Sequence, residues 1–515
     1  MADRKLLIFN FDGTSNDPGD AVQTADRRGA IDDDSITNVL KFHFLAGGNL
    51  KLQTPGKKKK LPPNRQLCFY YSGIGTYGNV FQRMYNAGLS STRLDVRTIL
   101  NNALADFTAN YTDGDRILLT GFSRGAALAR RFAAIINAKV SGKDIIEAVF
   151  DTVASIGLPN LSRSMRPETE VVFEHGCTLP SNVLKALHMV SLDDKRKAFQ
   201  PTLMNSDKKV EEIWFTGAHS DVGGGYYFDG LADVVFRYMI NWIESLDWSV
   251  ELLSPSQIDY ENLVGKNAGY EITTDDLSID PDYFGDNHEQ SRTAAVEWLT
   301  LMDRRLCVLK NDALDPEARP KVFHSVARRI ACDRNYLPRS LKGIRHLVVY
   351  DSGASEEAEG YTRHKESNLQ YLRRLTVGES VEAHAFAHKK FNHSGVLVEA
   401  GGKYKFEVKK KGGRDQEWRD AGIVCTALGW NRKSVKKGWK EIAIQGMEPF
   451  RRYPQADWFH LIGSVGDDEH GHFPVGKGCT QEITSTGELC LFANDLDRFY
   501  GNNFGKLIVT ISRIA

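Results

Sequence analysis

Cysteine is scarce in this sequence, and its cysteines do not fall into pairs. There are 7 of them among 515 residues, an odd number with no paired spacing. This count argues against a fold held together by disulfides, and it favours synthesis in a reducing compartment. The length is sufficient for two or more domains with a large core.

The sequence also carries no formal net charge at pH 7. Lys and Arg together number 66, as do Asp and Glu, so bulk charge gives no support to a nucleic-acid partner. One local basic run, Lys57–Lys60, is the exception. Such a run favours a solvated loop, and contact with lipid headgroups is the alternative.

The sequence contains no long apolar run. None approaches the roughly 18 to 20 residues that a membrane-spanning helix needs, so we predict no transmembrane segment. The N-terminus passes at once into a hydrophobic stretch, Leu6–Phe9, with no charged-then-apolar leader and no cleavage site. We therefore predict a protein made in the cytoplasm without a signal peptide, and any export would use a route other than general secretion.

A serine between two glycines is the most informative feature that the sequence does contain. Gly121-Phe122-Ser123-Arg124-Gly125 follows a short apolar stretch, Arg116–Thr120, and precedes a helix-favouring stretch, Ala126–Ile136. A strand, Gly-x-Ser-x-Gly and a helix in this order are typical of the nucleophile elbow of an α/β-hydrolase. The turn would expose the serine oxygen above the sheet and place helix N–H groups behind it. For the five residues alone, an ordinary tight turn is the alternative.

Two further strand ends supply partners for Ser123. Asp151 lies at the end of a predicted strand within Ala148–Val153, where ligands and catalytic groups gather in open α/β sheets. His219 follows the predicted strand Val210–Phe215 in a glycine-rich loop. The order Ser123, Asp151, His219 is the hydrolase order of nucleophile, acid and base.

Each of these assignments has a rival. A lone Asp at a strand end also serves as a helix cap, and Asp221 is an alternative to Asp151 as the acid. His324 is an alternative to His219 as the base, because hydrolases often place the base late in the chain.

Backbone donors for an oxyanion are predicted at two places. One is the N–H of Arg124, at the helix N-terminus behind the serine, and the other is the loop of Asp12 and Gly13 after the predicted strand Leu6–Phe11. A glycine beside Asp suits a backbone that approaches a ligand closely, and α/β-hydrolases take their second donor from such a loop. An Asx turn is the alternative for Asp12 and Gly13.

Four motifs in this order resemble the serine hydrolase domain of type VI secretion lipase effectors. They are Phe11-Asp12-Gly13-Thr14, Gly121-Phe122-Ser123-Arg124-Gly125-Ala126, Phe150-Asp151-Thr152-Val153 and His219-Ser220-Asp221-Val222-Gly223-Gly224-Gly225-Tyr226. Two weaker stretches agree with them, Ser191–Arg196 and His324–Val326. The resemblance runs from the N-terminus to about residue 345. It implies an α/β-hydrolase fold, with a mostly parallel sheet and helices on both faces, and phospholipase activity of the A type on membrane phospholipids.

The same resemblance implies where the protein works. Effectors of this kind are exported by a contractile secretion system and act at the envelope of a target cell. A secretion spike protein and a cognate immunity protein are then expected partners. The hydrolytic chemistry itself needs no cofactor.

The character of the chain changes after the hydrolase motifs. Residues 1–345 are predicted to form the hydrolase domain and 346–380 a charged linker. From 381 to 515, short stretches with frequent Gly and Trp predict an all-β sandwich. Within the first domain, Ala294–Val308 has the spacing of an amphipathic helix.

The last stretch of the chain holds a group of oxygen ligands. Asp495 lies on one side of a short predicted loop, and Asn502 and Asn503 lie on the other. Carboxylate and amide oxygens are ligands that calcium prefers. A polar turn with Asx hydrogen bonds is the alternative.

This stretch resembles the C-terminal part of bacterial calcium-dependent galactose lectins, in a match over about residues 385–515. The resemblance implies calcium ligation by Asp495, Asn502, Asn503 and the backbone oxygen of Phe499. It also makes a glycan, such as lipopolysaccharide, an expected partner. The sugar-contacting His and Gln of the lectins have no clear counterpart within 421–445, so the resemblance does not extend to galactose specificity.

Other functions share these motifs. A soluble-ester hydrolase or a peptidase could use the same triad. A carbohydrate-binding adhesin with a vestigial hydrolase domain is the non-enzymatic alternative, and the intact Ser123, Asp151 and His219 argue against it. We therefore expect a serine esterase that acts on phospholipids, with calcium in its C-terminal domain as a structural or sugar-binding ion.

Overall fold

The structure, a computed structural model, divides the chain into two compact units. It describes residues 4–13, 34–51, 54–73, 90–140, 142–153, 179–246, 248, 250–264, 270–288, 301–333, 336–350, 353–361, 372–411, 413–431, 445–466, 471–496, 498–500 and 503–515. Of these, the residues up to 361 belong to the first unit and those from 372 onward to the second.

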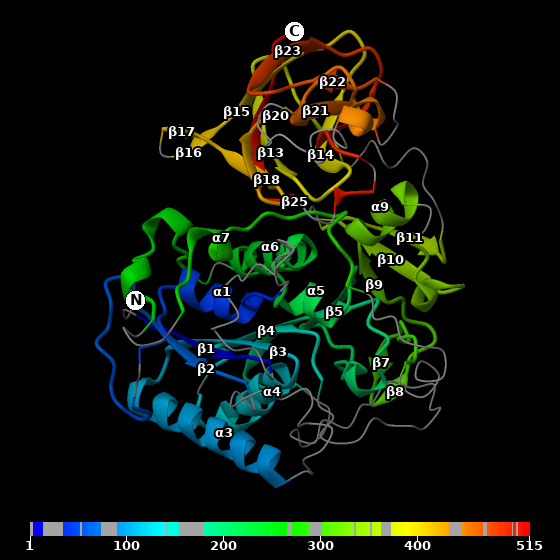
Figure 1. Cartoon of the computed structure of the whole chain (residues 1–515). Helices are drawn as coiled ribbons and strands as arrows, with labels where there is room; N and C mark the ends of the chain where they lie inside the picture. The colour runs from blue at the N-terminus through cyan, green and yellow to red at the C-terminus, as the bar shows by residue number, and fades with distance from the viewer. Residues whose placement is uncertain are drawn as a thin grey trace. The chain divides into compact units, whose positions relative to one another are not determined.

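A large sheet forms the centre of the first unit (Figure 1). Its strands are β1 (Leu6–Phe11), β2 (Gln66–Tyr71), β3 (Arg116–Phe122), β4 (Ile145–Phe150), β5 (Val183–Ser191), β6 (Val210–Phe215), β9 (Lys321–Phe323), β10 (Arg345–Val349) and β11 (Ser355–Glu359). Among the described residues their order is β11-β10-β9-β6-β5-β4-β3-β1-β2. Neighbouring strands are parallel except for β11, which pairs antiparallel with β10.

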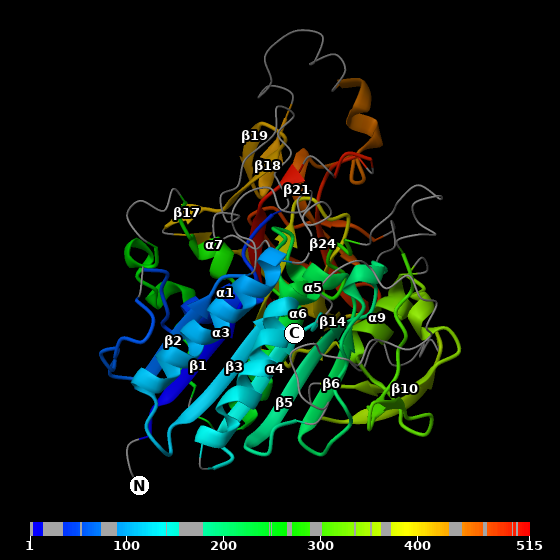
Figure 2. The same cartoon turned by 90° about the horizontal axis from the view of Figure 1, so that it is seen from below.

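Helices cover both faces of this sheet, which explains why its central strands are apolar. All residues of β1 and β4 are buried, because parallel strands between two helix layers have no solvent-facing side. On one face, α1 (Asn38–Leu45) and α6 (Gly230–Ser245) share a core with the strands. On the other face, α3 (Ser90–Asn110) and α4 (Arg124–Ile136) do the same, and Figure 2 shows them lying across the sheet.

One edge of the sheet contains residues that the sequence suggested were a linker. β10 and β11 lie in or beside 346–380, and the buried Val348 and Val349 belong to β10, which pairs with β9. Residues 346–380 are therefore not a single connection. The strand β11 alternates exposed and half-buried residues, as an edge strand does, and its charged composition is why the stretch resembles a linker.

The second unit is β-rich. Its strands are β12 (Arg373–Arg374), β13 (Ser380–Phe386), β14 (Asn392–Val398), β15 (Lys403–Val408), β16 (Lys410–Lys411), β17 (Arg414–Asp415), β18 (Glu417–Asp420), β19 (Ile423–Thr426), β20 (Leu428–Trp430), β21 (Trp458–Val465), β22 (Phe473–Pro474), β23 (Gly478–Glu482), β24 (Gly487–Ala493), β25 (Asn503–Phe504) and β26 (Lys506–Arg513). One sheet has the order β12-β14-β24-β21-β20-β19-β18-β25 and another the order β13-β26-β15-β23. Side chains of both sheets share one core, for example Leu461 and Leu491 with Phe406 and Val509. The predicted order of an α/β unit followed by a β-rich unit is therefore confirmed.

The smaller elements correct one prediction. They include α5 (His219–Gly223), α7 (Thr274–Leu277), α9 (His324–Cys332), β7 (Leu309–Lys310) and β8 (Ala313–Leu314). The helix predicted over Ala294–Val308 is wrong for residues 301–308, which are not helical, and 294–300 lie outside the described residues. The backbone here instead pairs with an earlier segment, since the Met302 N–H donates to the Lys195 oxygen at 2.6 Å.

Two expectations from composition can be compared with the structure. In the part of the chain that is described, no helix is both long and apolar enough to cross a membrane. Among the cysteines whose side chains are described, none forms a disulfide; they are Cys68, Cys307, Cys425, Cys479 and Cys490.

Candidate active site

Ser123 lies in a strained turn between β3 and α4. Its backbone angles are φ 57° and ψ −123°, a region that residues other than glycine rarely occupy. Close packing requires both flanking glycines. A Cβ on Gly121 would lie 2.6 Å from the Gly125 oxygen, and a Cβ on Gly125 would lie 2.2 Å from the Phe11 oxygen at the end of β1. The start of α4 is therefore pressed against the sheet, with the serine at the turn.

The end of β4 holds this turn in place. The Ser123 N–H donates to the Phe150 oxygen at 3.1 Å, and the Ser123 oxygen accepts from the Val153 N–H at 3.1 Å. Between Phe150 and Val153 lies Asp151, whose φ of 37° is also positive. The structure thus brings the Ser123 and Asp151 turns side by side.

A buried pair joins Asp151 to His219, the first residue of α5. The His219 Nδ1 lies 2.5 Å from the Asp151 Oδ2. Burial opposes a charge on Asp151, but Arg304 and His219 outweigh it and hold the pKa of this carboxyl well below its usual range. For His219, burial outweighs the carboxylate and lowers the pKa below the ordinary 6.5. A histidine in this state is neutral at pH 7 and can accept a proton.

The other ring nitrogen of His219 is available for that proton. His219 Nε2 is buried and has no hydrogen-bond partner among the described residues. The ring packs against Phe122 at a centroid distance of 4.5 Å and against Phe199 at 5.0 Å. Phe122 directly precedes Ser123, so the ring lies beside the turn. With the Nδ1–H donated to Asp151, Nε2 carries the lone pair that can accept from a serine hydroxyl.

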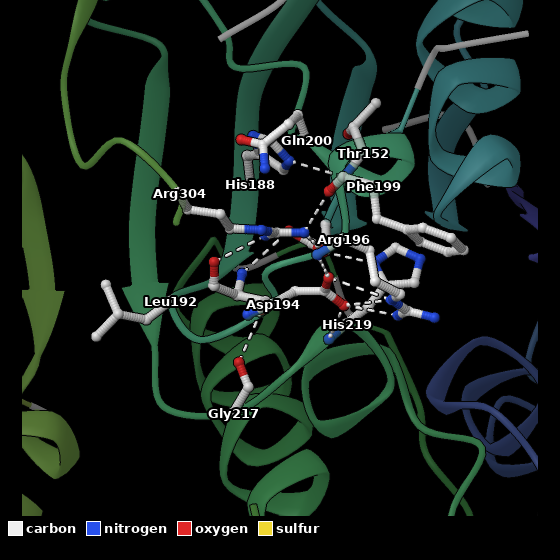
Figure 3. A network of polar contacts seen from close by, with 12 residues as sticks. Thr152, His188, Leu192, Asp194, Arg196, Phe199, Gln200, Gly217, His219 and Arg304 are labelled. Carbon is white, nitrogen blue, oxygen red and sulfur yellow. Dashed lines mark hydrogen bonds and ion pairs between the residues drawn. The ribbon is translucent and has the colours of Figure 1, made fainter. Parts of the chain in front are cut away.

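Arg304, which is labelled in Figure 3, completes the surroundings of Asp151. Its Nη1 and Nη2 donate to the two Asp151 oxygens at 2.5 and 2.8 Å. The same guanidinium donates to the backbone oxygens of Ser191 at 2.7 Å and Phe199 at 2.6 Å. Sequence analysis missed this residue, because Ala294–Val308 showed only the periodicity of a helix.

Two further polar groups fix the backbone around the pair. Asp194 accepts the His219 N–H at 3.1 Å, and His188 Nε2 accepts the Thr152 N–H at 3.1 Å. His188 Nδ1 in turn lies 2.8 Å from Glu212. One of the weaker family-like stretches contains Asp194, whereas nothing in the sequence singled out His188.

The rival residues have other partners. Asp221 accepts the Ala218 N–H at 2.8 Å and lies 2.5 Å from His288 Nδ1, so it caps α5 and holds the segment that contains His288. His324 begins α9 and lies among the rings of Tyr283, Phe323 and Tyr350. Among the described hydrogen bonds and ion pairs, neither rival joins Asp151 or His219.

The predicted oxyanion donors differ in availability. The Arg124 N–H opens α4 directly after Ser123, where a helix N-terminus favours negative charge. The Asp12 N–H donates to the Tyr71 oxygen at 3.0 Å, so the sheet already uses this donor. The Gly13 N–H donates to the carboxylate of Asp12 itself at 2.6 Å. The sequence could not show either hydrogen bond, because both depend on how β2 and the loop pack.

The Asp12 carboxylate is unusual in its own right. It is buried and accepts from the hydroxyls of Thr37 and Tyr70, each at 2.7 Å. Burial outweighs these hydrogen bonds and the one from Gly13, and it raises the pKa of Asp12 to about 6. The loop after β1 is thus held together by its own buried carboxyl group.

The predicted calcium ligands are described in part. The Asp495 carboxylate is buried and accepts from the Leu496 N–H at 2.7 Å and from Asn503 Nδ2 at 3.0 Å. Asn503 Oδ1 is buried and has no hydrogen-bond partner within the described ranges. Phe499 is 51% exposed, and Asn502 lies outside the described residues. The structure therefore brings Asp495 and Asn503 together from the two sides of the loop.

Comparison with known proteins finds a family to which part of the first unit is similar. Residues 5–140 and 145–242 match the family described as "T6SS, Phospholipase effector Tle1-like, catalytic domain". This region includes Ser123, Asp151 and His219. The match covers less than half of the 515 residues, and this part of the chain is similar to that domain. A search of curated proteins finds no match.

Three solved structures show weaker similarity. An uncharacterized protein from Pseudomonas aeruginosa is 17% identical over 52% of this chain and 49% of its own, with a TM-score of 0.31. The Tle1 effector, bound to the VgrG spike from the type 6 secretion system, is 24% identical over 43% of this chain and 51% of its own, with a TM-score of 0.26. The EclA N-terminal domain, a PllA-like lectin, is 18% identical over 26% of this chain and 94% of its own, with a TM-score of 0.18. The chain spans about half the length of the first two, and TM-scores of this size do not establish a shared fold.

We expect Arg304→Met to lower the free energy of unfolding by about 3–5 kcal/mol, because it leaves a buried carboxylate without its main counterion. Urea denaturation of the whole chain measures this. Arg305→Met is the matched control, since this neighbouring side chain is exposed and its loss should change stability by no more than about 0.5 kcal/mol. Equal effects of the two substitutions would contradict the role given to Arg304.

Proposed function

We propose that the first unit is a serine hydrolase of α/β-hydrolase fold that cleaves acyl esters of membrane phospholipids. The observation that carries the proposal is the buried Asp151–His219 pair beside the strained Ser123 turn. All three residues lie inside the region that matches the phospholipase effector catalytic domain. A strained serine, a neutral buried histidine and an ionised carboxylate are the groups that acyl transfer by a serine enzyme requires.

Ser123 acts as the nucleophile in this proposal. Its oxygen forms a bond to the ester carbonyl carbon while its proton passes to His219 Nε2. Asp151 orients the His219 ring and stabilises the imidazolium that forms. The bond to the glycerol oxygen then breaks, and His219 returns the proton to that oxygen. Water repeats the sequence, releasing the fatty acid and restoring the serine.

The Arg124 N–H is the donor that we propose for the oxyanion. It lies at the N-terminus of α4, where the helix dipole favours developing negative charge. The Gly13 N–H would join it only after leaving the Asp12 carboxylate, which it contacts at 2.6 Å. The loop after β1 would therefore move when substrate binds.

Delivery and partners follow from the same proposal. The chain would be made in the cytoplasm and exported by the type VI secretion system to act on the envelope of a target cell. A secretion spike protein and a cognate immunity protein are the partners that such an antibacterial effector needs. The solved Tle1 effector is bound to the VgrG spike. This is a property of Tle1, and a spike partner for the present chain is part of our proposal.

The alternatives differ in substrate. A soluble-ester hydrolase or a peptidase would use the same side chains, and an adhesin with a vestigial first unit would use none of them. Assays on phospholipid vesicles, a short water-soluble ester and a peptide amide separate these cases. The match to a phospholipase effector domain favours the vesicles.

Ser123→Ala should reduce phospholipid hydrolysis by roughly 10⁴- to 10⁶-fold, because the covalent route is lost. Fatty-acid release from defined phospholipid vesicles measures this in the purified chain. Ser220→Ala, a change in the neighbouring α5 helix, is a control that should retain activity. Turnover near that of the unmodified chain in folded Ser123→Ala protein would exclude the mechanism.

Parallel substitutions decide between the two candidate bases. His219→Ala should remove nearly all hydrolysis, because Nε2 is the proposed proton acceptor. His324→Ala should retain it, because that ring packs among aromatic side chains in α9. The same fatty-acid assay applies, and loss of activity only in His324→Ala would reverse the assignment.

We also propose that the second unit binds calcium through Asp495 and Asn503. The supporting observation is the buried Asn503 Oδ1, which has no partner among the described residues and lies on the side chain that contacts Asp495. Burial raises the pKa of Asp495, and a cation would favour its ionised form. The Phe499 backbone oxygen and Asn502 would complete the protein ligands.

Bound calcium would link the two sides of this loop. Calcium takes about 6 to 8 oxygen ligands, so hydroxyl groups of a glycan such as lipopolysaccharide could complete the set. A second binding site of this kind would raise the local concentration of the enzyme at a glycan-bearing envelope.

Calorimetry of the whole chain with calcium should give a binding signal that Asp495→Asn removes, because the substitution deletes the only carboxylate of the proposed set. Asp415→Asn is the control, since Asp415 lies in β17 and pairs with Lys477. The same heat in the unmodified chain and in Asp495→Asn, or none in either, would exclude the site.

A further inference from the structure

Arg196 is a cation fixed beside His219 that the proposed mechanism leaves unused. Its Nε donates to the Asp194 oxygens at 3.2 and 3.1 Å, and its Nη2 donates to Asp194 Oδ2 at 2.6 Å. Its guanidinium carbon lies 3.7 Å from the centre of the Phe199 ring. Asp194 Oδ2 also accepts the His219 N–H, and Phe199 packs edge-on against the His219 ring. One carboxylate and one ring therefore connect Arg196 to His219 (Figure 3).

The donors of Arg196 are only partly used. A guanidinium carries five N–H groups in one plane, and here Nε and Nη2 face Asp194. Within the described residues, none accepts a hydrogen bond from Nη1. The side chain is 13% exposed, against 0% for Asp194, so solvent reaches part of the Arg196 side chain.

The backbone holds Arg196 in position before any ligand arrives. Its N–H donates to Asp194 Oδ1 at 2.9 Å, and it forms an antiparallel bridge with Leu301. The segment then continues into η3 (Lys197–Phe199), which carries the stacked ring. A side chain fixed in this way loses little further freedom on binding, unlike an ordinary surface arginine.

We propose that Arg196 binds the phosphate of the substrate and gives the site its preference for phosphate-bearing esters. This inference rests on the proposed phospholipase function. A planar guanidinium fork matches phosphate oxygens in geometry and charge. In a glycerophospholipid the phosphate is on the glycerol carbon next to the one that carries an sn-2 ester. A cation beside the base is therefore where such a substrate needs one.

Two buried cations of the first unit fit this role less well. Arg304 is fully buried and already donates to Asp151 and to two backbone oxygens. Lys41 is likewise buried and pairs with Asp229 and Asp233. Arg196 combines partial exposure with unused donors.

The test compares two soluble substrates with identical short acyl chains, a phosphatidylcholine and a diacylglycerol. In Arg196→Gln the ratio of kcat/KM for the phospholipid to that for the neutral ester should fall roughly tenfold to a hundredfold, the loss expected for a charged hydrogen bond. Arg196→Lys keeps the positive charge but lacks the planar guanidinium, and its ratio should lie between those of the unmodified chain and Arg196→Gln. Arg345→Gln is the control, because Arg345 is exposed and pairs with Glu357, and it should leave the ratio unchanged.

The outcomes are distinguishable. Equal losses on both substrates would mean that Arg196 only supports His219 through Asp194, and would overturn the inference alone. An unmodified chain that cleaves the diacylglycerol but no phospholipid would overturn the proposed function and the inference with it. Adding inorganic phosphate to the neutral-ester assay tests whether the site binds free phosphate as well as the phosphate of a lipid. Stronger inhibition of the unmodified chain than of Arg196→Gln supports the site, and equal inhibition counts against it.

Discussion

The buried carboxylate of Asp151 is the group on which the rest of the site depends. An ion in a dry interior is unstable unless donors surround it. Here the donors come from three distant segments, with His219 after β6, Ser191 at the end of β5 and Arg304 from the irregular stretch before β7. Each donor that stabilises the charge is itself positioned by it. The orientation of the His219 ring is therefore a consequence of how these segments satisfy one carboxylate.

Backbone strain is concentrated around the same carboxylate. Ser123 and Asp151 both have positive φ, at a cost of about 1–3 kcal/mol each. The two turns are bonded to each other through Phe150 and Val153, and the strands that lead into them are buried. The large sheet and its helices therefore supply the free energy that keeps Ser123 and Asp151 in these strained conformations.

Asp495 in the second unit shows the same constraint with a different outcome. It too is a buried carboxylate just beyond a strand end, and it accepts from Leu496 and Asn503. At Asp151 a protein cation balances the charge. At Asp495 no described cation does so in the ion pairs of the structure, and the amide oxygen of Asn503 remains open. This difference is the physical basis for proposing a metal ion in the second unit and none in the first.

The sequence by itself determined the features that depend on contiguous residues. The turn at Ser123 needs glycines on either side and a strand and helix around them, and the positions of Asp151 and His219 follow from where apolar strands end. Only the tertiary structure decided which distant groups meet. Arg304 and His188 carry no local pattern, because their partners lie on other strands and loops. The Asp12 N–H donates to the Tyr71 oxygen only because β2 lies beside β1. Likewise, β11 is an edge strand only because it pairs with β10. A turn or a strand end depends on neighbouring residues, so the sequence determines it. The partners of a buried charge come from distant segments, so only tertiary packing decides which groups they are.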